Sequence, residues 1–446
     1  MLDQTTSAVS ATSARQDRLR AISAKNFAKL MPLLVVVYII SFIDRTNIGM
    51  AKSALEVDTG ISAAAYGLGA GLFFVTYAIL EIPSNLIMHK VGARFWIARI
   101  MITWGIISAL MAVTWNQASF YVLRMLLGAA EAGLYPGIIL FIAYWFPREF
   151  RAKANGIFLL GVSLANIVGA PLGGVLLRLD GAAGMHGWQW MFVIEGVPAV
   201  FLAFAVWFWL PDRPAQARWL SQADKDLLTA QLASEDTGAS NDHGNLRALL
   251  PVLRDPQIWV IIAIYFTHQI AVYSLSYFLP DIIRSYGIAD SLRIGLLTAI
   301  PWIAAAAGGV LIPRFATSFA KGRVIISAGL ATVAGGLTVA ALGSHGLAVA
   351  LIGFAVAASA FFVIQSVLFT IPPQRLSGAS MAAGIAFVNC CGLTGGFLGP
   401  TIMGKLEKVT SNPSSGLWFI VVLAVVGAAL TWALRPVAAD PSKAVR

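Results

Sequence analysis

Charge and cysteine are both scarce in this sequence. Asp, Glu, Lys and Arg make up 12% of its 446 residues, whereas soluble domains contain about 25%. The apolar residues, 58% of the chain, form runs of about 20, the length that crosses a bilayer core as a helix. This composition excludes an ordinary water-soluble domain and predicts an all-α polytopic membrane protein.

Signals for several other protein classes are also missing. The two cysteines, Cys390 and Cys391, are adjacent in an apolar run, which argues against a disulfide framework or a metal site. The segment GPTIMGKL at 399–406 resembles a phosphate-binding loop, but Leu406 replaces the required Ser or Thr and an apolar span precedes it. There is no H-E-x-x-H or G-x-S-x-G motif either, so we expect neither an enzyme nor a cofactor.

The apolar residues fall into twelve segments, and a long polar stretch separates the sixth from the seventh. The segments lie at about 30–50, 65–88, 95–114, 119–145, 155–177, 188–210, 257–279, 292–312, 323–343, 346–370, 378–403 and 415–434. The first of them is too long for a signal-peptide h-region, so we interpret it as an uncleaved span. Two six-helix bundles joined by a linker are therefore predicted. The expected parts are a cytoplasmic N-terminal tail (1–29), a first bundle (30–210), a cytoplasmic linker (211–256), a second bundle (257–434) and a cytoplasmic tail (435–446).

The excess of basic residues follows this topology. The formal net charge is +10, which on its own could suggest nucleic acid binding. With both termini in the cytoplasm, 23 of the 31 Lys and Arg residues fall in the inside segments and 6 in the outside segments. Such a bias is the positive-inside rule. Most of the positive charge is therefore interpreted as an orientation signal facing anionic lipid, and no nucleic acid partner is expected.

The central linker carries one helical pattern. Trp219, Leu220, Leu227 and Leu232 give it a partly amphipathic stretch, and Ser221 with Asp224 forms a weak capping signal. We predict a short surface helix beneath the bundle.

The two halves of the sequence resemble each other. The stretches MHKVGARFWIARI and SFAKGRVIISAGL both place Lys, Gly and Arg in a short inside loop before a span. WFPREFRAKANGIFLLGVSLANIVGAPLGG and TIPPQRLSGASMAAGIAFVNCCGLTGGFLGP both join a Pro and basic residues to a Gly-rich span that ends in a Pro. Small residues allow close helix packing, but repeats of six spans also indicate two bundles that rock about a site at the midplane.

Charged residues deep in the spans are few, and they lie in the first half. They are Asp44, Arg45, Glu81, Arg124, Glu131 and Glu195. The second half has neutral polar residues at comparable depth: His268, Gln269, Gln365 and Asn389. A charge at the centre of a membrane helix costs roughly 2.5–3.5 kcal/mol on insertion scales, so such residues indicate a functional site.

The spacing of these residues indicates what the site can do. Asp44 and Arg45 are neighbours, so on a helix they point about 100° apart, whereas Arg124 and Glu131 are two turns apart on one face. An arginine fork suits a carboxylate, and a buried acid suits a proton carrier. A site for an organic anion and for protons is predicted. Structural roles remain open: Asp44 as a partner of an arginine, Glu131 in a packing network.

Four segments carry a resemblance to a known family. FIDRTNIGMA, EIPSNLIMHKVGARFWIARI, YVLRMLLGAAEAGLYPGIILFIAYWFP and GWQWMFVIEG resemble the anion:cation symporters of the major facilitator superfamily, and the resemblance covers nearly the whole chain. The family includes bacterial permeases for sugar acids, tartrate, hydroxyphenylacetate and phthalate. The resemblance implies proton-coupled uptake of organic anions by alternating access.

The resemblance also assigns roles to residues. It implies that Asp44 and Glu131 carry the coupling protons and that Arg45 binds the substrate carboxylate. The other expected substrate ligands are Tyr77, Arg124, Gln365 and Asn389. The segment VGARF lacks the acidic residue usual in the superfamily's cytoplasmic gating loop, and our hypothesis is that Glu81 with Arg94 substitutes for it. Structural roles for Glu81 and a packing role for Asn389 remain alternatives.

The substrate is less sharply indicated than the family. AYGLGAGLFFVTYAIL, VYSLSYFLP and SGASMAAGIAFVN are most similar to the sugar-acid branch, with tartrate and aromatic acids as alternatives. An exchanger or facilitator without protons is the rival mechanism, which the buried acids disfavour, and a transporter-like sensor is a rival of another class. We expect a monomer in the inner (plasma) membrane of a bacterium, with a small organic anion, protons and lipid as its partners.

Overall fold

Helices build all the regular structure of the part of the chain that the computed structural model describes, residues 2–236, 249–342, 346–376 and 378–436. Residues 237–248 of the expected linker and residues 437–446 of the expected C-terminal tail lie outside the described residues. The helices of residues 2–209, called the first half below, are α1 (Leu2–Thr59), α2 (Ala63–Val91), α3 (Ala93–Leu110), α4 (Gln117–Glu131), α5 (Leu134–Trp145), α6 (Arg148–Leu176) and α7 (Gly187–Trp209). The next two are α8 (Gln222–Asp236) and α9 (Leu249–Arg254). Those of residues 256–433, called the second half, are α10 (Pro256–Ser285), α11 (Ser291–Leu311), α12 (Phe319–Ala341), α13 (Leu347–Ser359), α14 (Phe361–Leu368), α15 (Pro372–Arg375), α16 (Gly378–Leu393), α17 (Gly395–Thr410) and α18 (Leu417–Leu430).

The structure contains apolar helices of the kind that the sequence predicts. Within the described residues, 11 helical segments are long and apolar enough to cross a membrane, and Leu417–Ala433 forms a shorter apolar helix. The prediction of an all-α polytopic fold is confirmed. The first span is longer than expected, because α1 continues as helix to Thr59.

Local sequence signals set the ends of several helices. The side chain of Ser62 accepts a hydrogen bond from the backbone N–H of Ala65 at the start of α2, and Asn116 forms a capping box with Ser119 at the start of α4. Asp255 caps α10 in the same way. Each cap satisfies a backbone N–H that has no partner inside its helix.

One span, the fourth, is broken by a residue outside the right-handed helical region, among the spans that the structure describes. The fourth span changes direction between α4 and α5, where Gly133 has a φ of +90°. The tenth span is interrupted for one residue at Ala360, between α13 and α14, and the eleventh at Thr394, between α16 and α17, but both residues keep right-handed helical backbone angles. The fourth and tenth spans occupy matching places in the two halves, but only the fourth contains a residue with positive φ.

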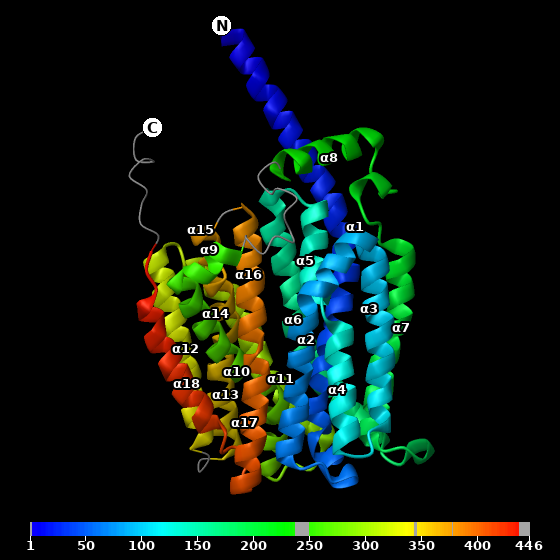
Figure 1. Cartoon of the computed structure of the whole chain (residues 1–446), viewed down its shortest axis with the longest axis vertical. Coiled ribbons are helices and arrows are strands. Elements are labelled where there is room, and N and C mark those ends of the chain that lie inside the picture. The colour runs from blue at the N-terminus through cyan, green and yellow to red at the C-terminus, as the bar shows by residue number, and fades with distance from the viewer. Residues whose placement is uncertain (1, 237–248, 343–345, 377, 437–446) are drawn as a thin grey trace.

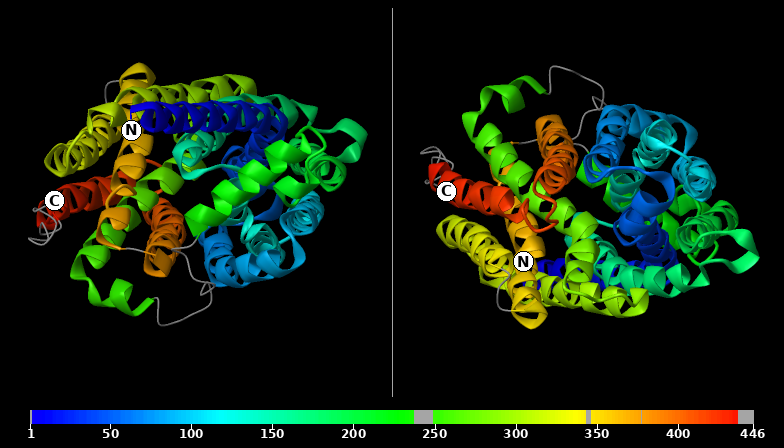
Figure 2. Two further views of the ribbon diagram at one scale, coloured as in Figure 1. Left: turned by 90° about the horizontal axis from the view of Figure 1, so that it is seen from above. Right: turned by 90° about the horizontal axis from the view of Figure 1, so that it is seen from below.

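The bundle has two distinct ends (Figure 1). We call the end at which α8 lies the linker end, and the end at which α1 stops at Thr59 the opposite end. The predicted linker helix is confirmed as α8, and it is tied to α1 because Arg18 Nε donates a 2.8 Å hydrogen bond to Asp224 Oδ1. Figure 2, viewed along the bundle axis, shows the helices of the first half gathered beside those of the second.

The two halves approach each other closely at the opposite end. The Tyr66 hydroxyl lies 3.3 Å from the carbonyl oxygen of Tyr277 across this seam. A Cβ on Gly67 would collide with the backbone of Pro400, and one on Gly174 with that of Ser291. Glycine at these positions lets backbone meet backbone, which is the packing that small residues allow between membrane helices.

Candidate anion and proton site

A buried ion pair lies at the centre of the first half. Arg45 on α1 donates from Nη2 to Glu131 Oε2 at 2.6 Å, and its Nε lies 3.3 Å from the same oxygen. The arginine side chain is 7% exposed and the glutamate side chain 0%. Glu131 is the last residue of α4, directly before the break at Gly133, so the break fixes where this carboxylate faces α1.

Aromatic rings surround the guanidinium of Arg45. Its Cζ lies 4.8 Å from the ring centroid of Phe42 and 5.1 Å from those of Phe73 and Tyr77. Such contacts stabilise a cation in a site that holds little water. Tyr273 on α10 also contacts this arginine from the second half. Arg45 is therefore a buried positive charge that residues of both halves contact.

Asp44 and Arg124, the other charged residues expected at this site, face different neighbours. Asp44 is hydrogen-bonded to the Ser108 hydroxyl on α3, as expected for a residue that points away from Arg45 on the same helix. Arg124 Nε and Nη2 donate to the backbone carbonyls of Gly69 and Ala70 on α2, at 3.4 and 3.3 Å. In this structure Arg45, and not Arg124, holds the acid of α4.

A chain of hydrogen bonds reaches the site from the second half. Gln365 Nε2 donates to the Tyr265 hydroxyl and that hydroxyl donates to Asn389 Oδ1, both at 3.4 Å. Asn389 Nδ2 then donates to Glu81 Oε1 on α2 at 3.0 Å. Glu81 lies one helical turn beyond Tyr77, and Tyr77 contacts Arg45. This series of hydrogen bonds therefore ends beside the residues around Arg45. The structure thus brings together Arg45, Tyr77, Glu131, Gln365 and Asn389, which the sequence analysis selected separately.

The structure does not bring Glu81 and Arg94 together, so their gating role stays a hypothesis. The described partner of Glu81 is Asn389, and the Arg94 guanidinium faces Asp212, with Nε 3.9 Å from Oδ2. The two residues also differ in exposure, because Glu81 is buried and Arg94 is exposed at the linker end.

Sequence reasoning missed a second buried charge cluster. Lys52 falls just beyond the expected end of the first span at residue 50, but α1 continues to Thr59 and the Lys52 side chain is 0% exposed. Its Nζ lies 2.6 Å from both Asp281 Oδ2 and Glu407 Oε1, and 3.4 Å from Glu56 Oε1. The pattern Lys52-x-x-x-Glu56 was the one local signal for it, since Asp281 and Glu407 come from α10 and α17.

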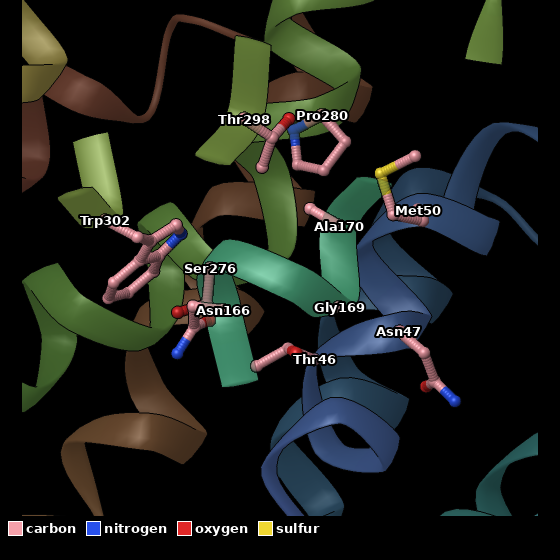
Figure 3. A pocket seen from close by; sticks show the side chains of 10 residues that line it. All are labelled: Thr46, Asn47, Met50, Asn166, Gly169, Ala170, Ser276, Pro280, Thr298 and Trp302. Carbon is pink, nitrogen blue, oxygen red and sulfur yellow. The ribbon is translucent and has the colours of Figure 1, made fainter. Parts of the chain in front are cut away.

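A small cavity lies beside Thr46 and Met50 of α1, which stand between Arg45 and Lys52 in the sequence (Figure 3). It has a volume of about 10 Å³ and is bounded by α1, α6, α10 and α11. Thr46, Met50, Ser276, Thr298 and Trp302 line it. A space of this size holds about one water molecule, so it is too small for an organic acid.

Comparison with known proteins decides the family. The sequence model of the Major Facilitator Superfamily matches residues 34–400. The chain belongs to the Major Facilitator Superfamily. It is 42% identical over 418 residues to the inner membrane transport protein RhmT of Escherichia coli, covering 94% of this chain and 96% of the relative. It is 38% identical over 412 residues to a putative tartrate transporter of Agrobacterium vitis, covering 92% and 94%.

A solved structure supports the fold of this superfamily member. A bacterial homologue of the human lysosomal transporter Spinster, in an inward-facing and occupied conformation, superposes with a TM-score of 0.72. The match covers 91% of this chain and 96% of that chain at 20% identity. Family membership and the relatives identify the chain as a multi-pass membrane transporter of small organic molecules rather than an enzyme.

Proposed function

We propose that the chain is a proton-coupled symporter that imports an organic anion by alternating access. The substrate class is a sugar acid or another hydroxy or dicarboxylic acid, which agrees with the transporter named for tartrate among its relatives. Like RhmT, it acts in the inner membrane of a bacterium. Both termini lie in the cytoplasm, the two six-helix halves are the moving bodies, and the monomer is the working unit.

The buried pair of Arg45 and Glu131 carries this proposal. A substrate carboxylate that binds the Arg45 fork must take the place of the Glu131 carboxylate, which lies 2.6 Å away. Glu131 would then be a buried charge without its partner, and in a low-dielectric site such a group takes up a proton instead. One anion bound at Arg45 is thereby linked to one proton bound at Glu131.

The second half completes the substrate site in this proposal. Tyr77 and Arg124 lie on the first-half wall, and Asn389 and Gln365 offer amide groups to substrate hydroxyls across the interface. Closure of the site then pulls the halves together around the substrate, because a ligand shifts a conformational equilibrium through contacts made better in one state. Asp44 is the second candidate proton carrier, held here by Ser108.

The decisive experiment uses purified protein in liposomes with an imposed inward proton gradient. Uptake of labelled galactonate, rhamnonate, gluconate, tartrate, hydroxyphenylacetate and phthalate is followed with and without a protonophore. Accumulation of one acid above equilibrium, abolished by the protonophore, is the expected result. Equilibration that ignores the gradient would instead indicate an exchanger or facilitator.

The Glu131→Gln variant tests the exchange of partners at Arg45. Glutamine cannot take up the coupling proton, so gradient-driven accumulation should be lost while exchange of internal for external substrate continues. Glu149→Gln, a change at an exposed acid at the start of α6, is the matched control and should leave both activities unchanged. If Glu131→Gln still accumulates substrate, the coupling proton binds elsewhere, and Asp44→Asn becomes the next variant to test.

A further inference from the structure

A cavity at the surface of the first half has no part in the transport site. Its volume is about 340 Å³, and it lies at the linker end where α7 stops at Trp209 and the chain turns into the linker. Helix α3 packs along α7 here, and α8 lies nearby (Figure 1). The cavity is therefore at the level where a bundle of membrane helices leaves the apolar core for the headgroup region.

Two arginines give this cavity a positive wall. Arg94, at the start of α3, and Arg218, in the linker, both line it, and both are exposed. The Arg94 guanidinium is only partly neutralised, since its Nε lies 3.9 Å from Asp212 Oδ2. No partner for the Arg218 side chain is found among the described residues. The cavity thus has room for one anionic group, and two guanidinium groups can donate hydrogen bonds to it. The carboxylate of Asp212 partly neutralises one of them, that of Arg94.

Aromatic residues form the other wall and continue along the helix. Phe208 and Trp209 line the cavity and are 71% and 73% exposed. Phe201 and Phe204 are also exposed, and with Phe208 they follow one face of α7 at helical spacing. An apolar stripe along a span faces hydrocarbon, and Trp at the end of a span marks the membrane boundary. The arginines therefore lie at the linker end of an exposed apolar face of α7 along which an acyl chain can pack.

We propose that this cavity binds the headgroup of an anionic phospholipid. The phosphate lies between Arg94 and Arg218, and an acyl chain follows Phe208, Phe204 and Phe201 along α7. Basic pockets beside membrane helices bind acidic lipid headgroups through such charge-assisted hydrogen bonds. A free anion would use the arginines but not the aromatic strip, so the combination favours a lipid over a soluble ligand. The bound lipid connects the end of α7, the start of α3 and the linker.

The test measures the melting temperature of the purified full chain in detergent with added lipid. Phosphatidylglycerol is compared with phosphatidylcholine at equal mole fraction, and with glycerol phosphate as the soluble anion. Wild-type protein should be stabilised by several degrees more by phosphatidylglycerol than by phosphatidylcholine, and not by glycerol phosphate. Native mass spectrometry of the same samples should detect one retained phosphatidylglycerol molecule more than in the Arg218→Gln variant.

A neighbouring arginine provides the matched control. Arg218→Gln should lose at least half of the phosphatidylglycerol increment, while Arg218→Lys keeps most of it. Arg213→Gln removes an exposed linker arginine that lies over the Tyr144 ring, 3.6 Å from its centroid, and does not line the cavity, so it should keep the full increment. The proposal is overturned if Arg218→Gln keeps the full increment, if Arg213→Gln loses as much, or if phosphatidylcholine or glycerol phosphate stabilises equally.

Discussion

At the scale of single residues, the fork of Arg45 matters as much as its charge. The guanidinium uses two nitrogens on Glu131 and packs against three aromatic rings at the same time. A planar, weakly hydrated cation suits this environment, whereas an ammonium group is compact and strongly hydrated. The site is therefore specific for arginine, and a substrate carboxylate that replaces Glu131 would be bound by the same two nitrogens.

Arg45→Lys keeps the charge and removes the fork, so it isolates this contribution. We expect the KM for the transported acid to rise at least tenfold, which corresponds to about 1.4 kcal/mol of lost binding. Initial rates in proteoliposomes over a range of substrate concentrations measure this effect. Arg99→Lys is the control, because Arg99 also packs on an aromatic ring, that of Trp96, but away from the site. An unchanged KM for Arg45→Lys would mean that this arginine does not bind the substrate.

The sequence singles out Asp44, Arg45, Arg124 and Glu131 as unusual charges, but it does not indicate which side chains they contact. A charged pair inside an apolar run is visible without a structure, and the rotation between neighbours on a helix separates Asp44 from Arg45. The choice of partner depends on how helices pack, which single-sequence spacing does not encode. Arg124 and Glu131 share a helix, yet Arg124 binds carbonyls of α2 while Glu131 binds Arg45.

At the scale of elements, the break in the fourth span has a definite cause. Gly133 adopts a φ of +90°, which side chains other than that of glycine rarely tolerate. A Cβ at this position would also meet the hydroxyl of Ser84 on α2, and that hydroxyl accepts a 2.9 Å hydrogen bond from Trp96 Nε1. The turn at Gly133 sets the position of Glu131, two residues earlier.

Gly133→Ala should therefore impair both stability and coupling. The added methyl group strains the backbone and displaces Ser84, and we expect a fall in the melting temperature of several degrees together with reduced gradient-driven uptake. Gly156→Ala is the matched control on α6, because its added Cβ would meet no described atom within 4 Å beyond its chain neighbours and the backbone of its own helix. Helix propensity makes that change neutral or stabilising by up to about 1 kcal/mol. A Gly133→Ala protein as stable and active as Gly156→Ala would refute the role of the break.

The contact between α8 and α1 depends on one carboxylate. The hydrogen bond from Arg18, assisted by the nearby Lys25, holds the pKa of Asp224 below its usual range. A lowered pKa means that the contact is fully formed above the ordinary pKa, about 3.9, and is lost as the pH falls through the lowered value. Docking of α8 should thus be constant between pH 5 and 8.

Asp224→Asn imitates the protonated state at neutral pH. Hydrogen exchange of the α8 amides should become about threefold faster, a modest effect because Arg18 is half exposed and its ion pair is screened by solvent. Asp226→Asn, at an exposed acid on the same helix, should leave the exchange unchanged. Wild-type exchange, corrected for its intrinsic pH dependence, that varied between pH 5 and 8 would contradict the assignment to Asp224.

The elements themselves were largely predictable, and the exceptions have physical reasons. Apolar runs of membrane length fixed twelve spans, and Ser221 with Asp224 indicated the start of α8. The one-residue interruptions at Ala360 and Thr394 were not predicted, because neither residue is a strong helix breaker and both keep helical backbone angles. The end of the first span was placed too early, because Lys52 looked like a loop residue until Asp281 and Glu407 supplied its partners.

At the scale of the whole molecule, ion pairs at two places join the halves at the opposite end, the buried cluster of Lys52 and an exposed pair. Lys52 lies fully buried among Asp281, Glu407 and Glu56, and Ser53 Oγ donates a 2.5 Å hydrogen bond to Asp281. Arg178 and Asp290 form the other pair, with side chains that are 51% and 46% exposed. An exposed pair contributes little to stability, whereas removing one partner of a buried pair leaves an uncompensated charge at a cost of about 3–5 kcal/mol.

Lys52→Met should therefore open this end of the molecule, and Arg178→Gln should not. We expect Lys52→Met to lower the melting temperature markedly and to favour states in which α10 and α17 have moved away from α1. Reaction of a Ser276→Cys probe, in a background where Cys390 and Cys391 are alanine, with a membrane-impermeant thiol reagent measures that opening, since Ser276 is buried in the seam. The probe should react at least tenfold faster in Lys52→Met, with Lys52→Arg intermediate and Arg178→Gln near wild type. Equal reactivity in Lys52→Met and Arg178→Gln would show that the buried cluster does not hold the halves together, and the seam would then depend on its glycine contacts, such as that of Gly67 with Pro400.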